Sequence, residues 1–541
     1  MKKILMLALC ALCLTVLSGC GGAPRADYCF VNGVRAESTN KSPRTHDIKT
    51  VTAQEDGALR FVNYPEGYTL DFPAGTQFDC SLCQLLVQAD TPDYSVTVSC
   101  ERSPYEDVEG YIDYYQNRFY THEGFRAANG LNLLCDETFD VGGLRCDLLA
   151  LERPGAENGL PKVYAYAYLY TGGQNYMRFL FRGTQADDAF LPRCRALLET
   201  YRSSEPVGFS YSHREAEPHL PAQWDEPTRA LYRHYLESDG VDFGIFSSPL
   251  QVNVDEGELL SLEERLDYRF EISLIYSQLH MPFPMAAMEK AAELGKTVEL
   301  TIQVSAQNNE DIFGYTPMFD LADGRLDGQI RALAQNIKAF GRPLLFRLNN
   351  EMNSDWTSYS GIVTLGDPEL YRSVWQRFYR IFEQEGVTNA IWVFNPNDNN
   401  YPPNKWNNFL CYYPGDEYVQ MIGLTGYNTG TYYNAETGEV WRSFERIYRA
   451  LNRSYEPVFG KFPWIITEFS SSSFGGDKAR WITEMFADLK TFPNIKAAVW
   501  FHYADFDTRP GREGTAARPY WLDETPETLE AFRRGLAGLQ G

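Results

Sequence analysis

Two glutamates in the second half of the chain follow apolar stretches, at positions where a buried strand would end in a polar side chain. Glu351 stands in "PLLFRLNNEMNSDW" and Glu468 closes "PWIITEF". Hydrolysis of a glycosidic bond needs two such carboxyl groups at one cleft. One donates a proton to the leaving oxygen, and the other attacks or stabilises the anomeric carbon. This chemistry requires a fold that brings both glutamates to one point.

The neighbours of the two glutamates predict different roles for them. Arg347 lies four residues before Glu351, and strand alternation points it inward, where it could hold Glu468 ionised as a nucleophile requires. Glu351 has neutral amide neighbours such as Asn350, which favour a raised pKa and a role as the acid. Tyr427, at the end of "LTGYN", could donate a hydrogen bond to Glu468.

Several further side chains are candidates for contact with a substrate. Trp356, Tyr359 and Trp500 could stack on sugar rings, although a tryptophan on a central strand is more often part of the core. His280 and His502 end predicted strands and could touch substrate, with a structural histidine as the alternative for each. Neither metal-ligand spacing nor a nucleophile elbow or phosphate-binding loop is present in the sequence, so we expect no metal and no cofactor.

From residue 225 the chain alternates between apolar runs and helical patterns. The runs span 241–248, 270–278, 297–305, 343–350, 390–396, 419–428, 463–470 and 497–503. Most are apolar throughout, as strands covered on both faces are. Eight parallel strands with interleaved helices predict a (β/α)8 barrel, whose active site lies at the C-terminal ends of the strands. An open doubly wound sheet is the alternative, but no glycine-rich loop follows the first strand.

The barrel prediction places the two glutamates together. Glu351 would end the fourth strand and Glu468 the seventh, nearly opposite each other across the barrel mouth. A single glutamate at a strand end is as easily a cap or an ion-pair partner as a catalytic group. Two of them on these strands, with Arg347 and Asn350 at these offsets, favour the catalytic interpretation.

The first part of the chain has a different organisation. Residues 1–19 read as a lipoprotein signal peptide, with "MKK", a short apolar run and "LSGC", in which Cys20 would be lipidated. Plain cleavage by the general signal peptidase is the alternative. Residues 20–55 are polar and without periodicity, as in a tether. We therefore expect an extracytoplasmic protein, anchored through Cys20 to the bacterial cell membrane at the cell surface.

Residues 56–208 alternate in the manner of antiparallel strands and contain two helical patterns, which predicts a smaller α+β domain before the barrel. We expect this domain to be a spacer or a partner-binding module, and the alternative gives it the main function. Residues 209–224 form a proline-rich linker, and residues 225–541 form the barrel domain. The oligomeric state is left open.

Composition limits the partners of this 541-residue chain. Its formal net charge of −23 argues against nucleic acid, whose phosphates attract basic surfaces. A neutral polysaccharide is not repelled by this charge. Aromatic residues make up 14% of the chain, enough to provide both a core and exposed rings on which sugars stack.

With these residues in view, the barrel over about residues 240–540 resembles glycoside hydrolase family 26, the β-mannanases and related endo-β-glycanases. The segments that carry the resemblance are "RLNNEMNSDWTSYSG", "WVFNPN", "YYPGDEYVQMIGLTGYN" and "ITEFSSS". The resemblance implies that Glu351 is the acid/base and Glu468 the nucleophile, in a retaining double displacement. It also implies that Arg347 and Tyr427 support the nucleophile and that Trp356 is a subsite aromatic.

One departure from the family pattern affects the substrate. The family usually has a histidine just before the acid/base, where this chain has Asn350, the residue that the wider clan uses to reach the sugar 2-hydroxyl. We expect an endo-acting enzyme on β-1,4-mannan or glucomannan, and the alternative is an endo-β-glucanase or xylanase of the same mechanism. A third possibility is a catalytically inactive surface lipoprotein that binds glycans.

Overall fold

The computed structural model describes residues 30–31, 34–35, 49–80, 82, 84–206, 215–305 and 313–539. The chain divides into two compact units that interleave along the sequence. The first comprises Met1–Glu101, Cys135–Ala150 and Val163–Ser212, and the second comprises Arg102–Leu134, Leu151–Lys162 and His213–Gly541. The predicted signal peptide and Cys20 lie outside the described residues. Within the described ranges, no helix has the length and apolar character that a membrane crossing needs.

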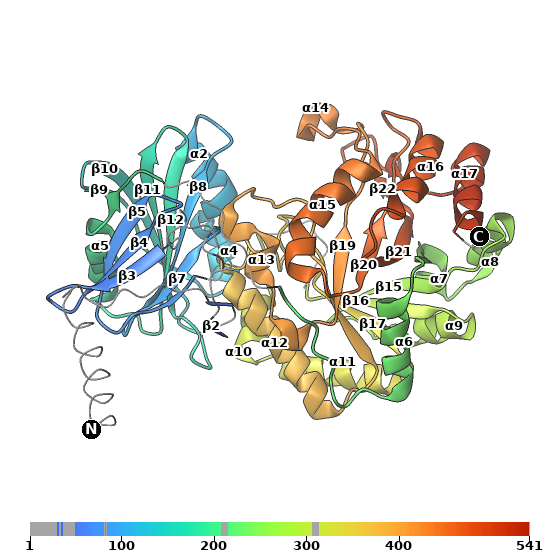
Figure 1. Ribbon diagram of the computed structural model, residues 1–541, viewed down its shortest axis with the longest axis horizontal. Helices are drawn as coiled ribbons and strands as arrows, with labels where there is room; N and C mark the ends of the chain where they lie inside the picture. The colour runs from blue at the N-terminus through green and yellow to red at the C-terminus, as the bar shows by residue number, and fades with distance from the viewer. Residues whose placement is uncertain are drawn as a thin grey trace, which may run out of the picture. The chain divides into compact units, whose positions relative to one another are not determined.

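The second unit contains the predicted barrel. Among the residues that the structure describes, eight strands close into a ring in which every neighbouring pair is parallel (Figure 1). The strands are β14 (Asp242–Ser247), β15 (Ile272–Gln278), β16 (Thr297–Gln303), β17 (Leu344–Leu348), β18 (Ala390–Phe394), β19 (Met421–Thr425), β20 (Trp464–Phe469) and β21 (Ile495–His502). Seven of the predicted runs contain one strand each, and the eighth, 497–503, overlaps β21. The (β/α)8 barrel is confirmed.

Helices cover the outside of this ring, as Figure 1 shows for α12 and α15. The longer helices are α6 (Glu226–Glu237), α8 (Gly257–Leu266), α9 (Met285–Glu293), α11 (Asp327–Phe340), α12 (Pro368–Glu385), α15 (Phe444–Phe459), α16 (Lys478–Leu489) and α17 (Pro526–Ala537). Shorter elements lie in the connections: α7 (Ser248–Asn253), α10 (Met318–Asp323), η2 (Lys405–Asn407), α13 (Phe409–Tyr412), η3 (Asp416–Tyr418), α14 (Asn434–Thr437), β22 (Ala504–Phe506) and β23 (Ala516–Pro519).

Helix α12 illustrates how the sequence sets these elements. The Asp367 side chain accepts a hydrogen bond from the Glu369 backbone N–H at 3.2 Å, and Pro368 occupies the first turn. Gly386 ends the helix with φ +69°, a left-handed conformation that glycine adopts without a side-chain clash. The apolar residues at helical spacing between these ends are buried: Leu370, Val374, Phe378 and Ile381.

The barrel interior is built in layers by strand alternation. Leu345 belongs to a buried apolar cluster with Ile391, Ile465 and Val499, one from each of several strands. Arg347 lies two residues further along β17 and therefore faces the same interior, one layer nearer the C-terminal ends. The apolar layer thus forms a floor on which a polar layer rests.

The first unit is built from two sheets over one apolar core. In the part of the chain that is described, one sheet has the order β6-β7-β8-β12-β11-β10-β9 and the other β13-β5-β4-β3. Their strands are β3 (Lys49–Ala53), β4 (Leu59–Asn63), β5 (Tyr68–Phe72), β6 (Gln77–Asp79), β7 (Val87–Asp90), β8 (Ser95–Arg102), β9 (Asn132–Val141), β10 (Leu144–Glu152), β11 (Val163–Gly172), β12 (Asn175–Gly183) and β13 (Arg202–Ser203). Helix α5 (Phe190–Glu199) packs its apolar face into this core. The separate pair β1 (Phe30–Val31) and β2 (Val34–Arg35) precedes them. Because β3 begins at Lys49, the sheet starts inside the predicted tether of residues 20–55.

The last boundary between the units falls between Ser212 and His213, inside the predicted linker, but two earlier segments of the predicted front domain belong to the second unit. The segment Arg102–Leu134 holds α2 (Val108–Ile112), the π-helix η1 (Asp113–Asn117), α3 (Arg118–Thr121) and α4 (Glu123–Ala128), and it belongs to the unit of the barrel. Its Tyr120 hydroxyl donates to the Ile362 carbonyl at 2.7 Å. The segment Leu151–Lys162 also joins the second unit, through a buried ion pair between Arg153 and Asp323 at 3.1 Å. The prediction treated residues 56–208 as one continuous domain and therefore missed that two of its segments belong to the second unit.

Barrel closure leaves no room for a side chain at Gly244 on β14. A Cβ there would lie 2.7 Å from the Ile272 Cβ and 2.9 Å from the Val499 Cγ2. We expect Gly244→Ala to lower the free energy of unfolding of the barrel by about 1–3 kcal/mol, because the neighbouring strands must move apart. Thermal unfolding of the purified protein measures this change.

The matched control is Gly328→Ala in α11, where a Cβ would meet nothing within 4 Å. This change should leave stability unaltered or raise it by up to about 1 kcal/mol. If both variants unfold at the same temperature as the wild type, the close contact described for a side chain at position 244 is contradicted.

Candidate active site

Glu351 lies in the tight turn that follows β17. Asn349 and Glu351 have φ values of +51° and +59°, in the left-handed region that residues other than glycine seldom adopt. The turn is held because the Glu351 N–H donates to the Asn395 carbonyl at 2.8 Å, and the Asn349 side chain accepts from the Val304 N–H at 2.9 Å. Such backbone strain persists where the surroundings fix it, commonly at functional sites.

Glu468 lies inside β20, on the seventh strand of the barrel. The pairing of β20 with each of its neighbours is irregular near Glu468. The register with β19 shifts between Leu424 and Thr425, and the register with β21 shifts between Ile466 and Phe469. A register shift of this kind re-aims a side chain. The Glu468 side chain is consequently directed to the layer occupied by Arg347, 2.8 Å from its guanidinium.

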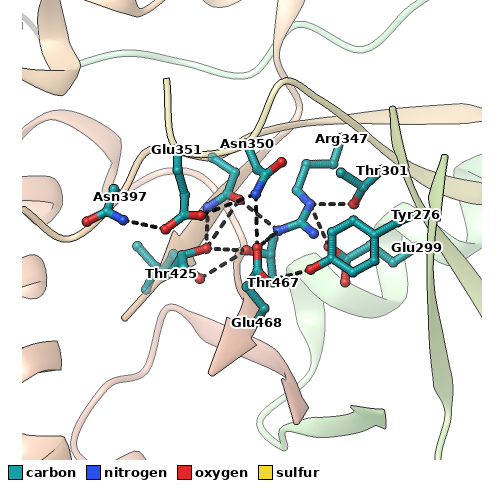
Figure 2. A network of polar contacts seen from close by, with 12 residues as sticks. Tyr276, Glu299, Thr301, Arg347, Asn350, Glu351, Asn397, Thr425, Thr467 and Glu468 are labelled. Carbon is teal, nitrogen blue, oxygen red and sulfur yellow. Dashed lines mark hydrogen bonds and ion pairs between the residues drawn. The ribbon is translucent and has the colours of Figure 1, made fainter. Parts of the chain in front are cut away.

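The Asn350 amide joins the two carboxyl groups. Its Nδ2 donates to Glu468 Oε1 at 3.2 Å and lies 3.3 Å from Glu351 Oε2, and Figure 2 shows both carboxyl groups directed toward it. The Asn350 Oδ1 in turn accepts from Gln303 at 3.0 Å and from the Tyr359 hydroxyl at 3.1 Å. The orientation of the amide is therefore fixed, and the structure brings together the two glutamates that the sequence singled out.

Glu468 accepts hydrogen bonds on both oxygens. Arg347 and Asn350 donate to Oε1, and the hydroxyls of Tyr276 and Tyr427 donate to Oε2, the latter at 3.0 Å. Hydrogen bonds from cationic and neutral donors stabilise a carboxylate. The contacts predicted for Arg347 and Tyr427 are both present.

Arg347 is fully buried beneath the two glutamates. Its Nε donates to Thr301 at 2.6 Å, and its Nη1 donates to Asn395 at 2.9 Å as well as to Glu468. On its far side lies a third carboxyl group, Glu299 on β16, at 3.3 Å (Figure 2). Burial raises the pKa of Glu299 to about 8, although the charge of Arg347 opposes this.

Glu351 differs from Glu468 in its surroundings. Burial raises the pKa of Glu351 to about 8, and the negative charge of Glu468 adds to the effect. Arg347 and a hydrogen bond from Asn397 act in the opposite direction without cancelling it. At neutral pH Glu351 therefore carries a proton that it can donate, beside a carboxylate held by four donors. A protonated carboxyl group can donate its proton to a leaving group, and a carboxylate beside it can attack the carbon atom from which that group departs.

Sequence reasoning missed Tyr276, Asn397 and Glu299. Tyr276 lies on β15, and nothing in "FEISLIYSQ" distinguishes it from a core aromatic. Asn397 stands in "WVFNPN", a segment that carried the family resemblance, so its signal was present but was not assigned to a residue. Glu299 is a charged residue in the apolar run "TVELTIQ", and this mismatch was the available signal.

Two predicted substrate-contacting residues are placed wrongly. The side chains of Tyr359 and Trp500 are both fully buried, so no sugar ring can stack on either. Tyr359 instead supports Asn350, and the Trp500 indole donates to the Tyr520 carbonyl at 2.8 Å within an aromatic core that includes Trp481. Strand alternation placed Trp500 on the side that faces the helices.

The remaining candidates are dispersed. His502 is buried, its Nδ1 accepts from the Leu522 N–H at 3.0 Å, and burial lowers its pKa to about 4, so it is a neutral structural residue. This corrects the expectation that it touches substrate. His280 is exposed and follows β15 by two residues, and Trp356 is half-buried in the turn after Glu351. Both stay predictions.

Comparison with known proteins shows what part of the barrel is similar to a family of hydrolases. The model of glycosyl hydrolase family 26 matches residues 293–466, which include Glu351 and end two residues before Glu468. Endoglucanase H of Acetivibrio thermocellus is 35% identical over 224 residues, which are 40% of this chain and 23% of that protein. A mannan endo-1,4-beta-mannosidase of Bacillus subtilis is 30% identical over 118 residues, 20% of this chain and 31% of that protein.

This chain thus spans less than a third of the length of these curated relatives. Among solved structures, a modular endo-beta-1,4-mannanase from Cellulomonas fimi matches with 17% identity and a TM-score of 0.43, over 59% of this chain and 76% of that one.

The raised pKa values give a prediction that does not depend on the reaction. Glu351 and Glu299 should each be protonated below pH 8 and lose their protons as the pH rises through about 8. Difference infrared spectroscopy should show the bands of two protonated carboxyl groups disappearing in this range. Glu351→Gln should remove one band and Glu299→Gln the other.

The same experiment tests the coupling between the glutamates. Glu468→Gln should lower the pKa of Glu351, because the charge of Glu468 contributes to raising it. A Glu351 band that titrates near the ordinary value of a glutamate in the wild type would contradict the burial that we describe.

Proposed function

We propose that this protein is a retaining endo-β-glycosidase of glycosyl hydrolase family 26, whose model matches residues 293–466, and that it cleaves a neutral polysaccharide. The observation that carries the proposal is the pair of glutamates joined by one amide, of which one is protonated at neutral pH and the other is held as a carboxylate by four donors. The net charge of −23 is compatible with an uncharged polymer and unfavourable for a polyanionic one.

In the proposed reaction Glu351 donates its proton to the glycosidic oxygen while Glu468 attacks the anomeric carbon. The bond to the leaving sugar breaks, and a covalent glycosyl-enzyme forms on Glu468. Glu351, now deprotonated, removes a proton from a water molecule that attacks the same carbon and releases Glu468. Arg347 stabilises the carboxylate before attack and again as it departs.

β-1,4-Mannan or glucomannan is the proposed substrate, in agreement with the mannanase relatives of Bacillus subtilis. A β-glucan is the second candidate, and two observations favour it. The endoglucanase relative has the higher identity, and Asn350 stands 3.2 Å from the proposed nucleophile, where it could bind a 2-hydroxyl. That hydroxyl is axial in mannose and equatorial in glucose and xylose, so one position distinguishes these substrates.

A panel of mannan, glucomannan, mixed-linkage glucan and xylan tests the proposal through release of reducing sugar. Glu351→Ala and Glu468→Ala should each reduce turnover by about a hundredfold or more, because each removes a group that acts in the transition state. Glu289→Ala, at an exposed position on α9, is the control and should retain full activity.

Azide can replace the missing groups and tells the two roles apart. With an aryl glycoside, Glu351→Ala should be rescued by azide as a glycosyl azide of retained configuration, and Glu468→Ala should give the inverted product. If the wild type releases no more sugar from any polymer than these variants do, the protein is a glycan-binding lipoprotein without turnover.

For localisation we propose a lipid anchor at Cys20 on the outer side of the bacterial cell membrane, on the basis of the "LSGC" motif. Cys20→Ala expressed in a bacterium should move the protein from the membrane fraction to a soluble one. The Cys29→Ala variant is the matched control and should stay with the membrane. Equal distribution of the wild type and Cys20→Ala would contradict the anchor.

A further inference from the structure

A group of tyrosines gathers on the segment Arg102–Leu134, which the sequence placed in the front domain and the structure places in the barrel unit. We call Tyr105, Tyr111, Tyr114 and Tyr115 the tyrosine cluster. Tyr105 and Tyr114 are 53% and 57% exposed, which is unusual for side chains of this size. Nothing in the proposed reaction uses them.

The cluster is an ordered set of rings. Tyr115 lies between the two exposed tyrosines, with its ring centroid 6.2 Å from that of Tyr105 and 4.7 Å from that of Tyr114. Tyr111 packs against Tyr115 at 5.0 Å and against Tyr105 at 6.0 Å. Hydrogen bonding to Tyr105, followed by burial, raises the pKa of Tyr115 to about 12, so this ring stays a neutral phenol.

The cluster rests on a rigid base. The Tyr111 hydroxyl donates to the Asn404 side chain, and the Tyr120 hydroxyl donates to the Ile362 carbonyl at 2.7 Å, so both attach the segment to loops of the barrel. The Tyr105 backbone is fixed by the Ser103 side chain, which accepts from its N–H at 3.0 Å. Tyr114 and Tyr115 stand in the π-helix η1, and single π-helical turns often mark functional sites.

An ion pair connects the cluster to the turn that carries Glu351. Arg118 lies 4.6 Å from the centroid of the Tyr114 ring, and its Nη2 is 3.3 Å from the Asp355 carboxylate. Asp355 follows Glu351 by four residues and precedes Trp356. The cluster therefore borders the turn on which the proposed acid stands.

We propose that the tyrosine cluster is an additional binding platform for the polysaccharide, which holds sugar residues beyond the bond that is cleaved. The proposal rests on the proposed function, because the occupant is the same polymer that extends from the two glutamates. The platform lies on the side of Glu351, so it contacts the part of the chain that departs as the leaving group.

The chemistry of the cluster suits a neutral sugar chain better than a protein or a membrane. A tyrosine ring offers an apolar face, on which the C–H side of a sugar packs, and a hydroxyl at its edge that can bond to sugar hydroxyls. Arg118 and Asp355 beside it neutralise each other and supply further donors and acceptors. A membrane-binding surface would instead combine apolar residues with an excess of basic ones.

A second loop extends the exposed aromatic surface on the same side. Tyr401 is 48% exposed, and its N–H donates to the Asn353 carbonyl at 2.8 Å, which ties it to the turn of Glu351. Burial is the main cause that raises the pKa of Tyr401, and the charge of Asp398 adds to it while that of Arg442 opposes it. The charge of Asp355 makes a smaller contribution in the same direction as burial, and it also raises the pKa of Tyr115. Asp355 is therefore near both the cluster and this loop.

The test compares a double variant, Tyr105→Ala with Tyr114→Ala, against the wild type and against Tyr315→Ala, an exposed tyrosine elsewhere in the same unit. On the preferred polymer the double variant should raise KM about five- to tenfold with kcat little changed, because each ring contributes binding that does not change in the transition state. Hydrolysis of an aryl glycoside, which is too short to reach the platform, should stay at the wild-type level. Tyr114→Trp alone should leave the polymer KM near the wild-type value, since it keeps a ring at this position.

Native gel electrophoresis with mannan, glucomannan, mixed-linkage glucan or xylan in the gel separates this proposal from the proposed function, because it needs no turnover. Retardation of the wild type that weakens in the double variant but not in Tyr315→Ala supports the platform, even if no polymer is cleaved. The proposal is overturned if no polymer retards the wild type, or if the double variant is retarded and cleaves polymer as the wild type does. A loss of aryl-glycoside activity in the double variant would also overturn it, since the cluster would then support the fold of the site.

Discussion

The buried ion pair between Arg347 and Glu468 is the constraint on which the site depends. Both groups are almost completely removed from water, and a charge in such a place is tolerated only when its partners compensate for the lost hydration. Thr301 and Asn395 bind the guanidinium, while Tyr276 and Tyr427 bind the carboxylate. Together with the pair itself, these residues come from six different strands or the loops that follow them, so the pair requires the barrel to be closed.

The distribution of protons around that pair keeps the site close to electrical neutrality. Four ionisable groups, Glu299, Arg347, Glu351 and Glu468, lie in contact or linked by one amide. With Glu299 and Glu351 protonated at neutral pH, the cluster holds one positive and one negative charge. Ionisation of either would place a second negative charge in a medium that solvates it poorly. The property that makes Glu351 a proton donor is therefore also the one that lets three carboxyl groups share a small volume.

The sequence was sufficient for the barrel and for the centre of the site. Apolar runs with helical punctuation located all eight strands, because strands covered on both faces have a pattern that depends only on local composition. Arg347 and Glu468 could be paired because alternation along β17 and the symmetry of the barrel fix where each points. Tyr276 and Glu299 could not be found in this way, since their role depends on the side-chain layer that several strands build together.

The errors have equally specific causes. Tyr359 and Trp500 were assigned to substrate from residue type and position along the chain, but exposure is decided by what packs over them. The helical pattern over residues 108–125 was identified correctly and was assigned to the wrong unit. Hydrophobic periodicity predicts that a helix has an apolar face, but it does not predict which of the two units packs against that face.

The exchange of segments between the two units has a consequence for how such a protein can evolve. Recombination usually moves domains as contiguous blocks, with one junction at each end. Here a junction near residue 208 would carry Tyr120 and Arg153 away from Ile362 and Asp323, leaving the buried Asp323 carboxylate with one of its two cationic partners. The front half of the gene therefore cannot be replaced by an unrelated cassette without damage to the barrel unit, and the two halves are expected to be inherited together.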